Sequence, residues 1–593
     1  MSPRAEYETR LRARRDEHAA LAAWIARLSR LRMATFGVGL ALLFLAFDFR
    51  LVPRWLVWLP AAGFVGLVVA HQRARRAERR VARGVRFYEL GVARLDHAFA
   101  GRGIAGERFL DPAHPYAADL DLFGRGSLFE LLCTARTQAG EETLARWLLA
   151  PAAPAEVRAR QRAVDELRAR LDLREAIALL GEDVRGVVDP AALTAWATAE
   201  PRRPTRLARG LAAALPGLTC TAAAAWNLEA LGPWPMLVAG AAQIAFALRL
   251  RAQVLPAIRH AAQPAAHLAL LAELLAELER ATFETPGLVA LHSAITNAGA
   301  TPARRIARLE RLVNLLDAHR NQVFALASFV LLWRTNFALA IETWRAESGP
   351  AVPRWLAAIG ELEALLALAS HAFEHPDDPF PELVDASPRF DGVGIGHPLI
   401  PEERCVRNDL RLDDARRVVI VSGSNMSGKS TLLRTVGVNV VLALAGAPVR
   451  ARRLVLTALA VGAAIRITDS LQDGTSRFYA EVKRLSRIVE LGGGALPLLF
   501  LLDEILSGTN SHDRAIGAEA IVRTLAARGA LGLVTTHDLA LARIADGLGA
   551  PAANVHFEDH LEDGRMCFDY TMRPGVVTKS NALALMRAVG FEV

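Results

Sequence analysis

The stretch VVIVSGSNMSGKST, residues 418–431, decides the fold of the C-terminal region of this chain. An apolar run, typical of a buried strand, leads into the pattern G-x-x-x-x-G-K-S, which begins at Gly423 and ends at Ser430. Glycines let the backbone turn tightly enough for successive N–H groups to point at phosphate oxygens, and a helix beginning there presents its positive end to the same group. The stretch therefore predicts a phosphate-binding loop between a strand and a helix.

The polar residues of this loop have distinct expected roles in binding ATP and Mg²⁺. The ammonium of Lys429 is expected to reach the β- and γ-phosphate oxygens, and the hydroxyl of Ser430 is expected to ligate Mg²⁺. The chain has only three lysines, so a lysine at this place in the pattern rarely arises by chance. The loop residues expected to bind the nucleotide are Gly423, Ser424, Asn425, Met426, Ser427, Gly428, Lys429, Ser430 and Thr431.

Two further apolar runs end in polar residues, as parallel strands around a phosphate site do. The run 497–502 is followed by Asp503 and Glu504; the first carboxylate is expected to hold the Mg²⁺ shell and the second to orient or deprotonate the attacking water. The run 531–536 is followed by His537, which is expected to sense the γ-phosphate. The alternatives are a strand that merely ends in acidic surface residues and a structural histidine.

Composition places few limits on partners. A formal net charge of +8 and a pI of about 9.8 favour nucleic acid or anionic lipid, but the charges are spread along the chain and not gathered into a basic tail. The four cysteines form no C-x-x-C pair, which argues against a zinc site and a disulfide framework and fits a reducing compartment. The first thirty residues are charged, so no signal peptide is expected.

Two uncharged segments near the N-terminus predict a membrane hairpin. Residues 33–47 carry no charge, and residues 55–70 are again uncharged before a run of arginines at 73–80. Each segment is slightly shorter than the roughly 20 residues of a spanning helix, but the flanking side chains can snorkel and extend it. We expect two membrane helices joined by a tight turn.

A second hairpin is predicted at residues 210–228 and 230–248. Arginines precede and follow it and none lies between its two segments, so the positive-inside rule places the bulk of the protein in the cytoplasm. The predicted location is the cytoplasmic membrane, multi-pass, with the ATPase and the helical core on the cytoplasmic side. The alternative is that these segments are buried helices of a large helical domain.

The other segments before residue 389 are helical in period. Thr301 and Pro302 predict the start of a long helix running towards Trp344, inside which the apolar stretch 324–333 is expected to be buried. Residues 371–388, rich in Pro and Asp, are expected to link into the ATPase domain. The predicted domains are an N-terminal helix (1–30), a first transmembrane hairpin (31–75), a first helical core segment (76–205), a second transmembrane hairpin (206–250), a second helical segment forming core and lever (251–388) and the ATPase domain (389–593).

The motifs together resemble those of the MutS family of ABC-type ATPases. The loop at 423–431 is similar to the family's Asn-Met-bearing P-loop, DEILSGTN at 503–510 to its Walker B segment, and TTH at 535–537 to its histidine loop. GTSRFYAE at 474–481 is similar to its signature loop, and the pattern at 123–148 resembles its helical core.

The resemblance implies a fold class, a reaction and a partner. It implies a multidomain chain with an α/β P-loop ATPase domain at the C-terminus and an all-α core and lever domain before it. It also implies Mg²⁺-dependent hydrolysis of ATP to ADP and phosphate by a homodimer. Ser476 of one subunit would contact the γ-phosphate bound by the other, so the catalytic set would be Glu504, His537 and Ser476 in trans, with Ser430 and Asp503 on the metal.

The departures from the family pattern concern the partner. The mismatch-reading domain with its Phe-x-Glu wedge is replaced here by the first predicted hairpin, so no mismatch-wedge contact is expected, and no endonuclease tail is expected either. The segment from Cys405 to Asn408 resembles the loop that holds adenine, with Cys405 where an aromatic residue would stack.

Three functions are therefore compared. The favoured one is a membrane-anchored, dimeric MutS-like ATPase whose helical core transmits ATP-driven closure to a partner, for which mismatched or structured DNA is left open. The alternative is an ABC-like energy module for a membrane process without DNA binding. A true mismatch-repair protein that has gained anchors is disfavoured by the missing wedge domain.

Overall fold

The computed structural model describes most of the 593-residue chain. The described residues are 2–180, 189–200, 205–259, 261–296, 301–317, 325–466, 477–506, 509, 511–537, 542, 545, 547, 551–562 and 565–577. They form two compact units, the first made of residues 1–134, 144–175 and 365–593 and the second of residues 135–143 and 176–364. A mostly helical N-terminal region is followed by a C-terminal α/β domain, which confirms that level of the sequence prediction.

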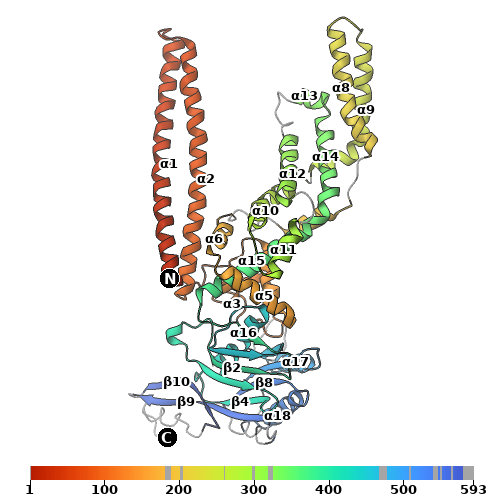
Figure 1. Cartoon of the computed structure of the whole chain (residues 1–593). Coiled ribbons are helices and arrows are strands. Elements are labelled where there is room, and N and C mark those ends of the chain that lie inside the picture. The colour runs from red at the N-terminus through yellow and green to blue at the C-terminus, as the bar shows by residue number, and fades with distance from the viewer. Residues whose placement is uncertain are drawn as a thin grey trace. The chain divides into compact units, whose positions relative to one another are not determined.

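The first unit begins with a long helical hairpin. Helix α1 (Pro3–Phe47) is uninterrupted, and it lies against α2 (Trp58–Leu95) along its length (Figure 1). Ser2 caps the start of α1 by accepting a hydrogen bond from the N–H of Ala5 at 3.3 Å. The predicted N-terminal helix and the first uncharged segment are thus stretches of one helix, about 65–70 Å long at 1.5 Å per residue.

A buried polar cluster closes the base of this hairpin. The hydroxyl of Tyr7 in α1 donates to Glu374, the last residue of helix α15 (Val352–Glu374), at 3.2 Å, and Arg94 in α2 donates to the same carboxylate. Gly91 faces the Tyr7 ring so closely that a Cβ there would lie 2.6 Å from it. The lower ends of both hairpin helices are therefore fixed against the end of α15.

Short helices follow the hairpin along the chain. These are α3 (Leu128–Leu132), α4 (Gln138–Leu149), α5 (Pro154–Arg168) and α6 (Leu171–Leu180). Asp119, before α3, is 1% exposed and accepts hydrogen bonds from the N–H groups of Ile465 and Arg466, which follow strand β6. This carboxylate satisfies two backbone donors at a strand end, so the segment before α3 belongs to the C-terminal domain's structure.

The C-terminal domain is built on two sheets. In the portion of the chain that is described, one sheet has the spatial order β1 (Glu382–Leu383), β5 (Arg453–Leu456), β2 (Phe390–Ile395) and β3 (Asn408–Leu412). The other has the order β10 (Arg565–Pro574), β9 (Ala552–Glu562), β4 (Val418–Ser422), β8 (Leu531–Thr536), β7 (Leu498–Asp503) and β6 (Ala460–Ala464).

The second sheet has the topology expected of a phosphate-binding domain. Strand β4 pairs in parallel with both β8 and β9, and β7 pairs in parallel with β8 and β6, whereas β10 is antiparallel to β9. The helices packed with this sheet are α16 (Lys429–Ala445), α17 (Arg477–Leu491) and α18 (Ser511–Ala527). All residues of β4 and β8 are buried, which accounts for their uniformly apolar runs.

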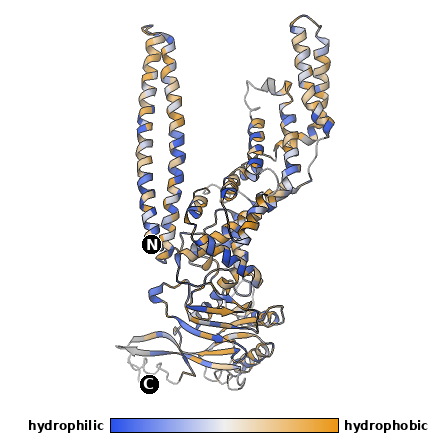
Figure 2. Cartoon of the chain, viewed as in Figure 1, coloured by the Kyte–Doolittle hydropathy of each residue, from blue (hydrophilic) through white to orange (hydrophobic). Residues whose placement is uncertain are grey.

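The second unit is helical. Its further helices are α7 (Pro190–Thr198), α8 (Arg206–Asn227), α9 (Trp234–Arg259), α10 (Ala262–Arg280), α11 (Pro286–Thr296), α12 (Pro302–Asp317), α13 (Ala325–Val330) and α14 (Trp333–Ser348). Helices α8 and α9 lie side by side, and α14 packs against α9 and α12. Apolar residues dominate α8 and α9 (Figure 2).

The prediction of one continuous helix from Thr301 towards Trp344 is wrong. Leu332 adopts a left-handed conformation with φ of 48°, which ends one helical segment and starts α14 at Trp333. The indole N–H of Trp333 donates to the carbonyl of Leu315 in α12 at 2.6 Å, so the chain folds back on itself. The stretch 324–333 is not uniformly buried either, because Phe329 is 60% exposed.

Four described helical stretches are long and apolar enough to cross a membrane by length and composition. In α1, in residues 54–95 and in α8, the share of the apolar window that is buried is only 6%, 0% and 17%. The fourth, residues 333–374, is 83% buried and belongs to the protein core. Helix α9, the second half of the second predicted hairpin, is not among the four.

Candidate functional site

The P-loop lies between the buried strand β4 and helix α16. Gly423 has a φ of 154° and Gly428 a φ of 102°, backbone angles that residues with a side chain rarely adopt. Met426 between them is also left-handed, with a φ of 69°. A Cβ at Gly423 would lie 2.8 Å from Oγ of Ser427, and one at Gly428 would lie 3.1 Å from the ring of Tyr570. Both glycines of the pattern are therefore required by backbone conformation and by space.

Lys429 starts α16 and points back into the loop. Its ammonium donates to the carbonyl oxygens of Gly423 at 2.8 Å and Ser424 at 2.9 Å, and it lies 3.4 Å from Oε1 of Glu504. The side chain is 5% exposed. The positive charge is thus held at the centre of the loop, where the loop N–H groups and the helix N-terminus also favour an anion.

The two carboxylates stand where β7 ends. The hydroxyl of Thr535 in β8 donates to Oδ1 of Asp503 and accepts a hydrogen bond from the N–H of Glu504 at 3.0 Å. Glu504 has φ of 45°, a left-handed conformation that turns its carboxylate away from the strand direction. Its Oε2 lies 3.4 Å from Nδ1 of His537, which follows β8. The structure brings Lys429, Glu504 and His537 together.

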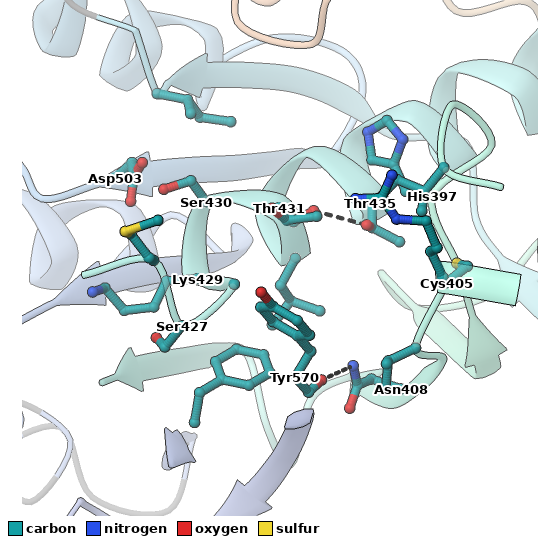
Figure 3. A pocket seen from close by; sticks show the side chains of 18 of the residues that line it. His397, Cys405, Asn408, Ser427, Lys429, Ser430, Thr431, Thr435, Asp503 and Tyr570 are labelled. Carbon is teal, nitrogen blue, oxygen red and sulfur yellow. Dashed lines mark hydrogen bonds between the residues drawn. The ribbon is translucent and has the colours of Figure 1, made fainter. Parts of the chain in front are cut away.

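The loop residues and the two carboxylates line one pocket of about 890 Å³ (Figure 3), whereas His537 is not among its described lining residues. All nine predicted loop residues except Gly423 line it, together with Asp503, Glu504 and Asn408. In Figure 3, Lys429, Ser430 and Asp503 lie on the left of the view, and His397 and Cys405 lie on the right. The hydroxyl of Ser427 is buried and has no hydrogen-bond partner within the described portion of the chain.

The far wall of the pocket contains a neutral histidine. Burial lowers the pKa of His397 to about 4, with a further lowering from the charge of Arg434. Its Nδ1 accepts a hydrogen bond from the N–H of Leu399 at 3.2 Å. The imidazole is therefore uncharged at neutral pH, and His397 itself adds no positive charge to the pocket. His397 was not singled out by its sequence context.

The segment expected to hold adenine differs from the sequence interpretation. Cys405 and Asn408 both line the pocket, but so does Tyr570 of β10, an aromatic residue from outside this segment (Figure 3). The amide of Asn408 donates to the carbonyl of Tyr570 at 3.0 Å and accepts from the N–H of Met572 at 2.7 Å. Asn408 therefore positions the strand that carries the ring. The sequence offered no signal for Tyr570, because it lies more than 160 residues after Cys405.

Two other sequence-predicted features have different outcomes. Ser476, expected to act in trans, lies outside the described residues. Glu481 of the same motif is 1% exposed and accepts a hydrogen bond from the N–H of Leu506, which has φ of 60°. Glu481 thus stabilises the turn after Glu504 and does not face the pocket.

Known proteins match the part of the chain that carries the P-loop and the two carboxylates. The family model described as MutS domain V matches residues 419–592. The chain is 35% identical over 242 residues to Endonuclease MutS2 of Thermus thermophilus, covering 40% of this chain and 30% of that protein. It is 35% identical over 250 residues to DNA mismatch repair protein MutS 2 of Halobacterium salinarum, covering 41% and 28%. DNA mismatch repair protein MutS 1 of the same species is 33% identical over 299 residues, covering 48% and 33%. The alignments span about a third of the length of these relatives or less.

Proposed function

We propose that this chain, whose C-terminal domain matches the MutS family, is a membrane-anchored, dimeric ATPase that couples ATP-driven closure to a partner. The observation that carries the ATPase proposal is the convergence of Lys429, Asp503 and Glu504 on one P-loop pocket. The lysine comes from the start of α16, and the two carboxylates come from the end of β7.

The pocket residues fit ATP. The Ser427 hydroxyl is buried without a described partner, and the Gly423 backbone leaves no space for a side chain beside it. The ammonium of Lys429 is held by two carbonyl oxygens, acceptors that phosphate oxygens would replace. We infer that the loop N–H groups and Lys429 hold the phosphates, while Ser430 and Asp503 hold Mg²⁺, which supplies charge neutralisation on the phosphates.

Glu504 is the proposed base. Its carboxylate lies at the end of a strand beside the P-loop and faces Lys429 on one side and His537 on the other. From this position it can accept a proton from a water molecule that attacks the terminal phosphate. His537 would then contact the same phosphate, and Ser476 of a second subunit would complete the site.

The exposure of α1, α2 and α8 supports the proposed membrane anchoring. Apolar surface of this extent is rarely left in contact with water by a soluble protein. Arginine is concentrated in these helices at the ends away from the hairpin turns. The proposed orientation places these ends, and with them the ATPase domain, in the cytoplasm.

DNA is the first partner to test. Two of the relatives are named as DNA mismatch repair proteins and one as an endonuclease. Binding of the full chain in detergent to a labelled mismatched duplex should weaken with salt, with a negative slope of log affinity against log salt concentration. Absence of binding at low salt would favour the alternative, an energy module for a membrane process.

The variant Glu504→Gln tests the ATPase proposal. The variant should bind ATP as well as the parent chain, release phosphate at least about a hundredfold more slowly, and accumulate as a closed dimer with ATP. Glu490→Gln, at the exposed end of α17, serves as the matched control and should hydrolyse ATP normally. Normal phosphate release by Glu504→Gln would show that Glu504 is not the base.

A further inference from the structure

A second pocket lies within the helical unit, between α9 and the turn that joins α13 to α14. Its volume is about 600 Å³, in the range of small-molecule sites. One wall is a single face of α9, on which Ile244, Leu248 and Arg251 follow one another at helical spacing. The other wall is formed by residues on both sides of the turn, among them Phe329 and Arg334.

The charge of this pocket is unbalanced. Arg251 and Arg334 are both exposed, and neither guanidinium has a hydrogen bond or an ion pair among the described residues. The described residues that line the pocket include no Asp or Glu. Two positive charges therefore border an otherwise mostly apolar cavity, and a ligand with a negatively charged group would be complementary to them.

The apolar side chains of the pocket are exposed. Ile244 is 46% exposed, Leu248 61% and Phe329 60%. In water this arrangement would leave three large apolar side chains uncovered around one cavity. Ile244 and Leu248 lie nearer to the tip of the α8–α9 hairpin than Arg251 does, because α9 runs from that tip towards Arg251. The apolar wall and the charged rim are therefore displaced from each other along α9.

The backbone at the turn is satisfied as it would need to be in a dry environment. Gln243 in α9 is 3% exposed, and its amide donates to the carbonyls of Phe329 at 3.1 Å and Val330 at 2.6 Å. Its own carbonyl accepts from the hydroxyl of Thr219 in α8 at 2.8 Å. One side chain thus supplies the hydrogen bonds that the carbonyls ending α13 could otherwise take only from water.

We propose that this pocket binds an anionic phospholipid. The headgroup phosphate would lie between Arg251 and Arg334, and an acyl chain would follow Ile244, Leu248 and Phe329. The apolar wall favours a lipid over a free phosphate or nucleotide, which would leave that wall uncovered. The proposal rests on the membrane anchoring proposed above. It makes the α13–α14 turn a second lipid-contacting element beside the α8–α9 hairpin.

The full-length protein in nanodiscs provides the test. The nanodiscs contain phosphatidylcholine and a small fraction of phosphatidylglycerol with a photoreactive diazirine in its acyl chain, and labelled peptides are mapped after irradiation. Labelling should concentrate on the pocket peptides of α9 and α13, and it should fall about tenfold in the double variant Arg251→Gln and Arg334→Gln. Arg249→Gln is the matched control, because Arg249 is exposed on the same helix but does not line the pocket.

The outcomes separate the two proposals. Equal labelling of the parent and the double variant, or equal labelling by the photoreactive form of phosphatidylcholine, would overturn the anionic site while leaving the anchoring intact. Crosslinks between two protein chains at this pocket would identify a second copy as its occupant and would also overturn it. Protein that is extracted from native membranes by carbonate would overturn the anchoring and the lipid site together.

Discussion

Glu374, at the end of α15, accepts hydrogen bonds from Nε of Arg94 in α2 at 3.0 Å and 2.9 Å to its two carboxylate oxygens. Both side chains are buried, and Tyr7 of α1 donates to the same carboxylate. Since α15 leads directly into the C-terminal domain, one carboxylate attaches both helices of the N-terminal hairpin to the chain that enters this domain. Any displacement of the hairpin base must move Glu374 or break this pair.

The Arg94–Glu374 pair should be essential for stability. Glu374→Gln leaves the Arg94 guanidinium buried without its counter-charge, a change that typically costs about 3–5 kcal/mol. We expect a clear drop in the melting temperature of the full chain in detergent. Arg15→Gln removes an exposed pair with Glu89 between the same two helices and should change stability by less than about 1 kcal/mol. Equal melting temperatures for Glu374→Gln and the parent would contradict the prediction.

Tyr570 should contribute to nucleotide affinity. Stacking of a base on an aromatic ring is worth about 1–3 kcal/mol, so Tyr570→Ala should weaken ATP binding about tenfold. Tyr570→Phe keeps the ring and should bind within about twofold of the parent chain. The measurement is the equilibrium titration of a fluorescent ATP analogue in detergent. If both variants bind like the parent, the ring does not contact the base.

Glu363 should make stability depend on pH. Burial raises the pKa of this α15 carboxyl to about 7 from its ordinary value of 4.5, although the N–H groups of Arg136 and Thr137 donate to it. Below pH 4.5 both folded and unfolded chains are protonated. As pH rises towards 7 only the unfolded chain ionises readily, so stability falls by on the order of 3 kcal/mol.

The variant Glu363→Gln isolates this effect. Its side chain does not titrate, so its melting temperature should fall less than that of the parent chain between pH 5 and pH 8. Differential scanning fluorimetry of the two proteins across that range gives the comparison. Melting curves that shift in parallel would show that Glu363 does not titrate in this window.

The topology proposal predicts an external loop between α8 and α9. Leu228 there is 76% exposed, and Cys220 in α8 is an exposed native thiol. Leu228→Cys in a Cys220→Ser background should react with a membrane-impermeant maleimide on intact cells. Ile516→Cys, at an exposed position of α18, should react only after lysis. Protection of Leu228→Cys in intact cells would overturn the proposed orientation.

The sequence was most informative where strands end at the phosphate site. Each strand of a buried parallel sheet is a short apolar run, and the polar residue that follows it must lie at the same edge. Gly423, Asp503 and His537 could therefore be expected near one another on the strength of the amino-acid pattern. The division into a helical N-terminal region and an α/β C-terminal domain also follows from the sequence, because the apolar pattern changes from helical spacing to short continuous runs.

Contacts between distant segments could not be predicted in this way. Tyr570 reaches the pocket from the other end of the domain, and Arg94 and Glu374 are separated by 280 residues. The sequence does not predict the break at Leu332, because nothing in a run of apolar residues marks a left-handed leucine. It is stabilised by Trp333 and Gln243, which tie the turn to other helices.

Under the proposed membrane topology, the burial of residues 333–374 bears on the compartment of the P-loop. Two hairpins that cross a membrane return the chain to the side from which it started, an even number of crossings. By length and composition alone the stretch 333–374 could count as one more crossing, and the ATPase domain would then lie on the opposite face, away from cytoplasmic ATP. Because 83% of its apolar window is buried within the protein, the proposed topology counts no crossing for this stretch, and the two proposed hairpins alone set the parity.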